Sequence, residues 1–119
     1  MSCSVLVVDD DASFRDQATR MLAAWGYAVV GEAGTVEEAV AGTRELCPDV
    51  ALVDIGLPDG DGLSLARRLG AMPRPPRVVL ISTDADATTQ SAARRAGASG
   101  FLPKDQLPSP AFRQLMDGG

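Results

Sequence analysis

Hydrophobic residues in this chain gather in short runs that alternate with longer amphipathic segments. The first run, Val5–Val8, contains no polar residue, which is typical of a strand buried on both faces of a parallel sheet. The next segment, Ala12–Trp25, places its apolar residues at helical spacing and ends at Gly26. This alternation continues along the chain. It predicts strands at 5–8, 27–30, 50–53, 78–81 and 100–102, and helices at 12–25, 36–46, 63–69, 88–96 and 110–116.

Capping residues indicate where several of these helices begin. The TVEE segment is typical of a capping box that opens the second helix, with Thr35 as N-cap and Glu38 reaching back. Asp11 lies where the first helix begins, and a carboxylate there is favourable to the helix dipole. Asp59 and Asp61 lie among glycines in a predicted turn, and we expect Asp61 to help cap the third helix.

Five strands that alternate with five helices predict an α/β fold. We expect a five-stranded parallel sheet with helices on both of its faces and right-handed crossovers. No internal repeat, low-complexity tract or internal linker divides the 119 residues, so we expect one domain over residues 1–119. Gly118-Gly119 either begins a linker to an output domain or is a frayed end.

Composition narrows the class of protein. Hydrophobic residues make up 45% of the chain and aromatic residues only 4%, which predicts an aliphatic core. The formal net charge of −5 argues against direct binding to nucleic acid or to an anionic membrane. Without a signal sequence or an apolar run of membrane-spanning length, we expect a cytoplasmic location. Cys3 and Cys47 form no CxxC pair, and we expect reduced thiols.

Two absences limit the chemistry that the chain can perform. It contains no histidine, which excludes a Ser-His-Asp triad and a histidine-ligated zinc site. It also lacks a GxxxxGK[ST] loop and a GxGxxG motif after the first strand, so nucleotide binding by those routes has no support. Carboxylate, hydroxyl and lysine chemistry remain.

Polar residues of these types follow four of the five predicted strands. In an open parallel sheet the carboxyl ends of the strands meet at one edge, where ligands bind. Two carboxylates crowded to about 5 Å repel each other by roughly 3 kcal/mol at an effective dielectric near 20, so a cluster of them favours a counter-cation. The residues at this edge are Asp9 and Asp10 after the first strand, Asp54 after the third, Ser82 and Thr83 after the fourth, and Lys104 after the fifth.

An all-oxygen ligand set without histidine or cysteine indicates a hard ion, Mg²⁺ or Mn²⁺, that retains several waters. Magnesium commonly binds together with phosphate oxygens, and a carboxylate beside it can act as a nucleophile toward phosphorus. The metal, a lysine ammonium and a hydroxyl donor would balance the charge of the resulting acyl phosphate. The residues at this edge therefore favour phosphoryl transfer onto an aspartate.

Four segments, "VLVVDDD", "VALVDIGLPDGDGL", "VVLISTDAD" and "AGASGFLPKD", occur in the order found in response-regulator receiver domains of two-component signalling. Over nearly its whole length the chain resembles this CheY-like family. The resemblance implies a doubly wound (βα)5 flavodoxin-like three-layer sandwich with strand order 2-1-3-4-5. Many receivers have proline directly after the lysine, whereas here Asp105 follows Lys104. The Lys-Asp pair is similar to that of receivers in LuxR/NarL-type regulators, which carry helix-turn-helix DNA-binding domains.

The resemblance implies a role for each residue at the carboxyl edge. Asp54 would be the phosphoacceptor. Asp10 would bind Mg²⁺ directly, Asp9 through water, and the backbone carbonyl of Gly56 would be a further metal ligand. The positions that tune phosphoryl lifetime in this family are here Gly56 and Asp84.

The resemblance also assigns a switch. Ser82 would be the hydroxyl that bonds the phosphoryl group, Lys104 would pair with that group, and the side chain of Phe101 would change rotamer with the switch. Strand alternation sends Ser82 and Thr83 to opposite faces, and the resemblance favours Ser82. An aromatic residue on a short strand is ordinarily part of the core, so Phe101 has two interpretations.

The implied function is a phosphorylation-dependent switch that serves a two-component system. A histidine kinase or phosphotransfer protein would supply the phosphoryl group, and the face of the fourth helix, fifth strand and fifth helix would shift to control an output such as transcription. Receivers use that face, or the first and fifth helices, for partners and homodimers. The domain would assist its own dephosphorylation without being an enzyme that acts on a diffusing metabolite.

Three other functions share parts of this pattern. An aspartyl-phosphate phosphohydrolase of the haloacid dehalogenase type needs an acid two residues after the nucleophile, but Gly56 occupies that position. In a flavodoxin-like binder of FMN, the acidic strand ends would repel the flavin phosphate. A receiver used only as an unphosphorylated scaffold would not need the full set of three aspartates, serine and lysine.

Overall fold

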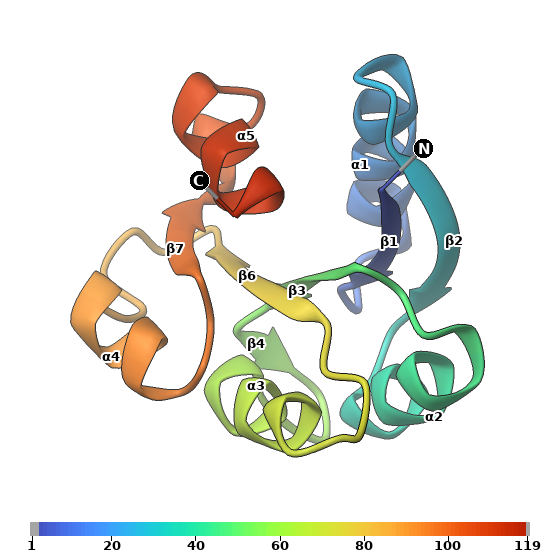
Figure 1. Cartoon of the computed structure of the whole chain (residues 1–119). Helices are drawn as coiled ribbons and strands as arrows, with labels where there is room; N and C mark the ends of the chain where they lie inside the picture. Colours follow the sequence, from blue (N-terminus) through green and yellow to red (C-terminus); the bar gives the residue numbers. More distant parts are fainter. Residues whose placement is uncertain (1–2, 119) are drawn as a thin grey trace.

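The computed structural model describes residues 3–118 and contains one five-stranded parallel sheet in the order β2-β1-β3-β6-β7 (Figure 1). A separate two-stranded antiparallel pair, β4-β5, follows β3. The elements in chain order are β1 (Ser4–Val8), α1 (Ala12–Ala24), β2 (Ala28–Ala33), α2 (Val36–Leu46), β3 (Val50–Asp54), β4 (Gly56–Leu57), β5 (Gly60–Asp61), α3 (Gly62–Gly70), β6 (Arg77–Ser82), α4 (Gln90–Arg95), β7 (Gly100–Pro103), the short 3₁₀ helix η1 (Lys104–Gln106) and α5 (Pro110–Asp117).

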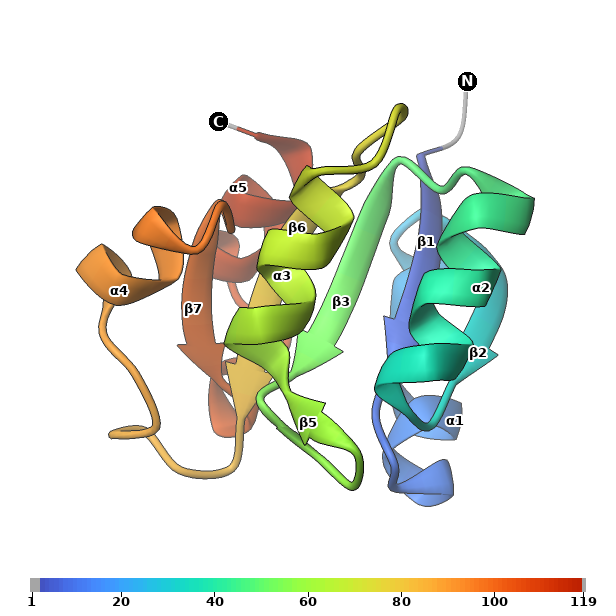
Figure 2. The same ribbon diagram turned by 90° about the horizontal axis from the view of Figure 1, so that it is seen from below.

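Helices cover both faces of the large sheet and form three layers. Helices α1 and α5 lie on one face, and α2, α3 and α4 lie on the other (Figures 1 and 2). Because β6 and β7 are the fourth and fifth strands of this sheet, its order matches the predicted 2-1-3-4-5 pattern. The predicted doubly wound α/β class is therefore confirmed.

The central strands are buried because their side chains alternate between two hydrophobic cores. Val5 and Val7 of β1 contact the core beneath α1 and α5, whereas Leu6 and Val8 contact the core beneath α2, α3 and α4. The four apolar residues of β3 alternate in the same way, and its last residue, Asp54, is also buried. Complete burial of a Val or Leu side chain stabilises a fold by roughly 1.5–3 kcal/mol, which explains the uninterrupted apolar runs.

The predicted helix caps are present, with one shift. Asp11 accepts a hydrogen bond from the Ser13 amide at 2.9 Å, and the Asp61 carboxylate caps α3. Thr35 Oγ1 accepts from the Glu38 amide at 3.0 Å, as expected of an N-cap. The Glu38 carboxylate, however, accepts from the amide of Gly34 at 2.8 Å, one residue before the N-cap to which the capping-box pattern assigns it.

Several element boundaries differ from the prediction. The expected loop at 55–62 contains the β4-β5 pair, and the expected fourth helix begins later because Thr89 caps it through the Ala92 amide. Strand β2 extends to Ala33 through Gly31 and Glu32, polar positions that an edge strand tolerates. The final helix ends at Asp117, and Gly118, with a left-handed φ of 78°, is its C-cap; Gly119 lies outside the described residues.

Cys3 and Cys47 are free thiols, as expected. The cis peptide bond in the described part of the chain lies between Leu107 and Pro108, and the bond after Lys104 is trans. Within residues 3–118, every helix is too short or too polar to span a bilayer.

Candidate functional site

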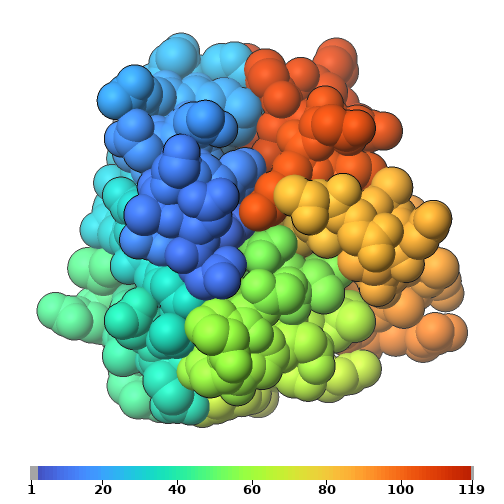
Figure 3. Space-filling view, turned by 180° about the vertical axis from the view of Figure 1, so that it is seen from behind, coloured from blue at the N-terminus to red at the C-terminus, as the bar shows by residue number. Residues whose placement is uncertain are grey.

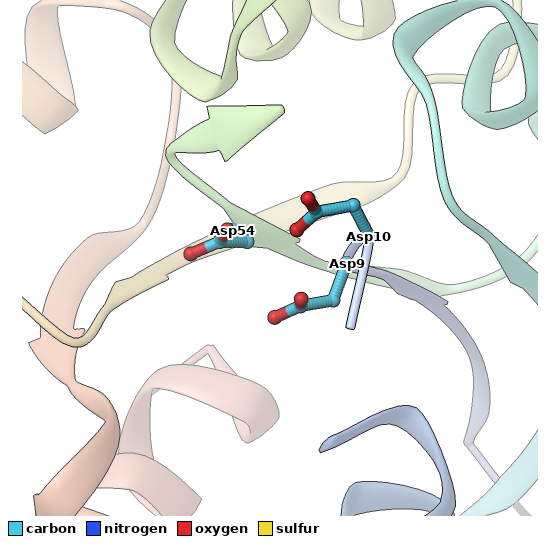
Figure 4. Close-up of side chains that lie close together, drawn as sticks. All are labelled: Asp9, Asp10 and Asp54. Carbon is cyan, nitrogen blue, oxygen red and sulfur yellow. The ribbon is translucent and has the colours of Figure 1, made fainter. Parts of the chain in front are cut away.

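Three carboxylates meet where β1 and β3 end. Val8 pairs with Val53, so Asp9 and Asp10 leave β1 beside Asp54, the last residue of β3. Each aspartate offers one oxygen, and these three oxygens lie within 4.8 Å of one another (Figure 4). In the space-filling view of this edge, the segments that follow β1, β3, β6 and β7 converge (Figure 3).

Lys104 brings a positive charge to these carboxylates. Its Nζ atom lies 2.5 Å from Asp9 Oδ2 and 3.7 Å from Asp54 Oδ1. The ammonium also lies 4.2 Å from the centre of the Phe14 ring, which supports it from the side of α1. Lys104 is placed here because it directly follows β7, whose last residue pairs with Ser82 of β6.

Asp9 is completely buried, and its two oxygens have different partners. Oδ1 accepts a hydrogen bond from the Asp11 amide at 2.9 Å. Oδ2 has the Lys104 ammonium but otherwise lacks a hydrogen-bond donor among residues 3–118. An incompletely satisfied buried carboxylate is costly, so this oxygen favours an additional cation or a metal-bound water.

The environment of Asp54 disfavours its charged form. Burial and, after it, the nearby charge of Asp9 raise the pKa of Asp54 to about 6, while Lys104 acts in the opposite direction. When all groups are ionised, three carboxylates and one ammonium leave two excess negative charges. A divalent cation would neutralise that excess, and the all-oxygen donor set fits Mg²⁺ or Mn²⁺.

Arg15 also contacts the acidic residues, and sequence reasoning missed it. Its Nη1 atom donates to the Asp9 carbonyl at 2.6 Å, and its Nε atom pairs with Glu32 of β2 at 3.0 Å. Arg15 therefore fixes the peptide that joins Asp9 to Asp10. Its position one turn after the Asp11 cap was the available signal, but an arginine on an amphipathic helix is usually solvated.

The structure distinguishes Ser82 from Thr83. Ser82 is the last residue of β6 and is buried, whereas Thr83 is exposed. Ser82 Oγ accepts a hydrogen bond from the Asp84 amide at 3.0 Å. The exposed Asp84 carboxylate accepts from the Asp86 amide at 2.9 Å, so it is held within its own turn.

Phe101 is buried in the core, whereas Gly56 is exposed beside Asp54. The Phe101 side chain is buried in the core beneath α2, α3 and α4, and its backbone is held by Gln90 of α4. Gly56 is exposed, and a Cβ atom there would lie 3.9 Å from Asp54 Oδ2. A side chain at position 56 would therefore contact the acceptor carboxylate.

Gly62 sets how closely α3 approaches the end of β3. A Cβ atom at this position would lie 2.8 Å from both the Asp54 carbonyl oxygen and the Ile55 Cα atom. The Gly62 amide donates to the Ile55 carbonyl at 2.8 Å. Glycine is needed here because any side chain would push α3 away from the backbone that carries Asp54.

Residues 5–113 match the family model for the response regulator receiver domain. The chain belongs to this family. The resemblance seen in its four sequence motifs is thereby confirmed, and the carboxylate cluster occupies the carboxyl edge of a receiver fold.

Known relatives place this receiver domain among regulatory proteins. It is 39% identical over 117 residues to the DNA-binding transcriptional activator DevR/DosR of Mycobacterium tuberculosis, covering 97% of this chain and 54% of that protein. It is also 39% identical over 106 residues to a protein-glutamate methylesterase/protein-glutamine glutaminase of Idiomarina loihiensis, covering 87% and 28% respectively. The receiver domain thus spans about half the length, or less, of curated relatives that it matches.

A solved structure agrees with the fold. The signal receiver domain of the putative response regulator NarL from Mycobacterium tuberculosis superposes with a TM-score of 0.87 at 33% identity, covering 98% of this chain and 95% of that chain. The likeness to NarL-type receivers that the Lys-Asp pair suggested is therefore confirmed.

Proposed function

We propose that this receiver domain is a phosphorylation-dependent switch in which Asp54 accepts a phosphoryl group from a partner histidine kinase or phosphotransfer protein. The convergence of Asp9, Asp10 and Lys104 around Asp54 carries this proposal. A carboxylate whose negative neighbours require a cation is suited to a metal-dependent reaction with an anionic phosphoryl group.

The residues at the edge would divide the chemistry among them. Asp10, Asp54 and the Gly56 carbonyl would hold Mg²⁺, with Asp9 acting through water, and the ion would neutralise charge on the carboxylates and the incoming phosphoryl oxygens. An Asp54 oxygen would attack phosphorus as the phosphorus–nitrogen bond of the donor histidine breaks. The carboxylate thus gains the phosphoryl group and the donor regains its imidazole.

Two side chains would respond to the new phosphoryl group. Lys104 Nζ is already 3.7 Å from Asp54 Oδ1, so a small movement from Asp9 would bring it to a phosphoryl oxygen. Ser82 Oγ accepts a bond from the Asp84 amide, which leaves its own hydroxyl proton free to donate. These contacts would favour a second conformation of the α4-β7-α5 face, which is a population shift between two states.

The output would lie outside this domain. DevR/DosR is a DNA-binding transcriptional activator and matches this chain over about half its own length, which favours transcriptional control through a further domain of a longer protein. The acidic charge of this domain supports a signalling role rather than direct contact with DNA. Hydrolysis of the acyl phosphate in the same site would return the domain to its unphosphorylated state. The domain would therefore act on its own phosphoryl group and not on a diffusing metabolite.

Acetyl phosphate with Mg²⁺ tests the proposal, because it is a small phosphodonor that needs no kinase. We expect intact-protein mass spectrometry to show one phosphoryl adduct on the wild type and none on Asp54→Asn. Asp16→Asn, at an exposed carboxylate paired with Arg20, serves as the matched control and should be phosphorylated normally. A wild type that takes up neither phosphoryl group nor beryllofluoride with Mg²⁺ present would contradict the proposal and favour a scaffold.

A further inference from the structure

The β4-β5 hairpin carries two aspartates that cap two different helices. Asp61 accepts from the Ser64 amide at 2.8 Å and so caps α3, the helix that follows it. Asp59 instead reaches 23 residues back along the chain: Oδ1 accepts from the Val36 amide at 2.7 Å and Oδ2 from the Glu37 amide at 3.2 Å. The hairpin is therefore attached to the N-terminus of α2 as well as to α3.

Helix α2 thus has two caps from different parts of the chain. Thr35, its own N-cap, satisfies the Glu38 amide, while Asp59 satisfies the two amides before it. These amides have no partner within the helix, and a carboxylate is favourable at the positive end of the helix dipole. The hydrogen bonds hold the pKa of Asp59 below its usual range, the Val36 amide being the largest cause.

Steric contact supports the same attachment. A Cβ atom on Gly60, the residue after Asp59, would lie 3.2 Å from Val36 Cγ2, so hairpin and helix are packed closely. At the other end of the hairpin, Gly56 lies against the Asp54 carboxylate, and the Ile55 carbonyl is held by the Gly62 amide. The segment from Asp54 to Gly62 is therefore fixed at its base by α3 and at its tip by α2.

We propose that Asp59 is a positioning residue of the candidate site: by holding the hairpin against α2, it keeps the backbone of Gly56 beside Asp54 and raises the affinity for a divalent cation. This inference rests on the proposed function, because it concerns the same cation site. Asp59 itself would touch neither the cation nor the phosphoryl group. It acts through the short hairpin that joins it to the acceptor residue.

Titration with Mg²⁺ separates this role from simple helix capping. For Asp59→Ala we expect the Mg²⁺ dissociation constant to rise about three- to tenfold. Removing a residue that directly supports a metal ligand typically weakens metal binding by about 10- to 100-fold, and Asp59 acts less directly. Asp59→Asn keeps one acceptor for the Val36 amide but removes the charge. The Mg²⁺ affinity of this variant should stay within about twofold of the wild-type value. The Gly56 amide resonance in NMR spectra reports the titration beside Asp54.

Thr35→Ala is the matched control, because it removes a cap from the same helix without touching the hairpin. We expect it to lower the melting temperature, as Asp59→Ala does, but to leave Mg²⁺ affinity unchanged. Faster hydrogen exchange of the Val36 and Glu37 amides in Asp59→Ala should accompany the loss of affinity.

Three results would overturn the proposal. Unchanged Mg²⁺ affinity in Asp59→Ala would show that Asp59 only caps α2. Equal weakening in Thr35→Ala would assign the effect to α2 stability in general, and equal weakening in Asp59→Asn would assign it to charge rather than to hydrogen bonds. If the wild type binds no Mg²⁺, both the proposed function and this inference are wrong, and this outcome differs from the other three.

Discussion

Neutralising Asp54 should stabilise the metal-free protein at neutral pH. Burial and the charge of Asp9 raise its pKa from 3.8 to about 6, which means that the folded state disfavours the ionised carboxylate. A shift of about two units corresponds to roughly 3 kcal/mol at 1.36 kcal/mol per unit. Because solvent reaches this edge of the sheet and screens the charges, we expect about 1–2 kcal/mol for Asp54→Asn.

The stability difference between Asp54→Asn and the wild type should depend on pH. A folded-state pKa above the unfolded value means that the folded protein binds the proton more tightly, so the penalty is absent below about pH 4. It grows as the pH rises from about 4 to 6 and is complete above that range. Urea unfolding in the presence of a chelator should therefore show Asp54→Asn to be more stable than the wild type at about pH 7.5, with the difference lost at about pH 4.

Two controls make this measurement decisive. Asp49→Asn alters a carboxylate at the opposite end of β3 that bonds Ser4, and it should not stabilise the protein. Saturating Mg²⁺ should narrow or reverse the advantage of Asp54→Asn, because the ion stabilises only a protein that binds it. Equal stabilities at neutral pH without metal, or a difference that persists at about pH 4, would refute the electrostatic reasoning.

Three further changes test other parts of the site. Mg²⁺ at about one hundred times its dissociation constant should stabilise the wild type by about 2.7 kcal/mol in thermal unfolding, and Asp10→Ala should remove most of that gain; an equal gain in the variant would exclude Asp10 as a ligand. Lys104→Met should cost about 3–5 kcal/mol in urea unfolding at neutral pH, because it leaves buried Asp9 without its ion partner; a cost near zero would contradict the importance of this ion pair for stability. Gly62→Ala should cost about 1–3 kcal/mol, because a methyl group cannot fit against Ile55, and wild-type stability would show that α3 moves freely.

The main sheet and the carboxylate cluster could be predicted because both follow from strand ends. Uninterrupted apolar runs identified β1 and β3, and parallel topology then required Asp9 and Asp54 to be neighbours at one edge. The β4-β5 pair could not be found in this way, because strands of two residues are too short to show alternation.

Long-range polar contacts were also beyond the sequence patterns. Asp59 was predicted only as part of a turn, and no local pattern around Arg15 predicts its bond to the Asp9 carbonyl. Gln90 likewise carries no local sequence signal of its bonds to the backbone of Phe101. Such partners are chosen by tertiary packing, which brings the groups together only after the sheet and helices are in place.

Gln90 covers part of the outer edge of the large sheet. Strand β7 is an outer strand, and an outer strand normally presents unpaired peptide groups that invite pairing with another chain. The Gln90 amide has the same donor and acceptor as a peptide group: its Nε2 donates to the Phe101 carbonyl at 2.6 Å, and its Oε1 accepts from the Phe101 amide at 3.0 Å. This side chain therefore pairs the peptide groups of Phe101 as a neighbouring strand would, and displacement of α4 would expose these groups.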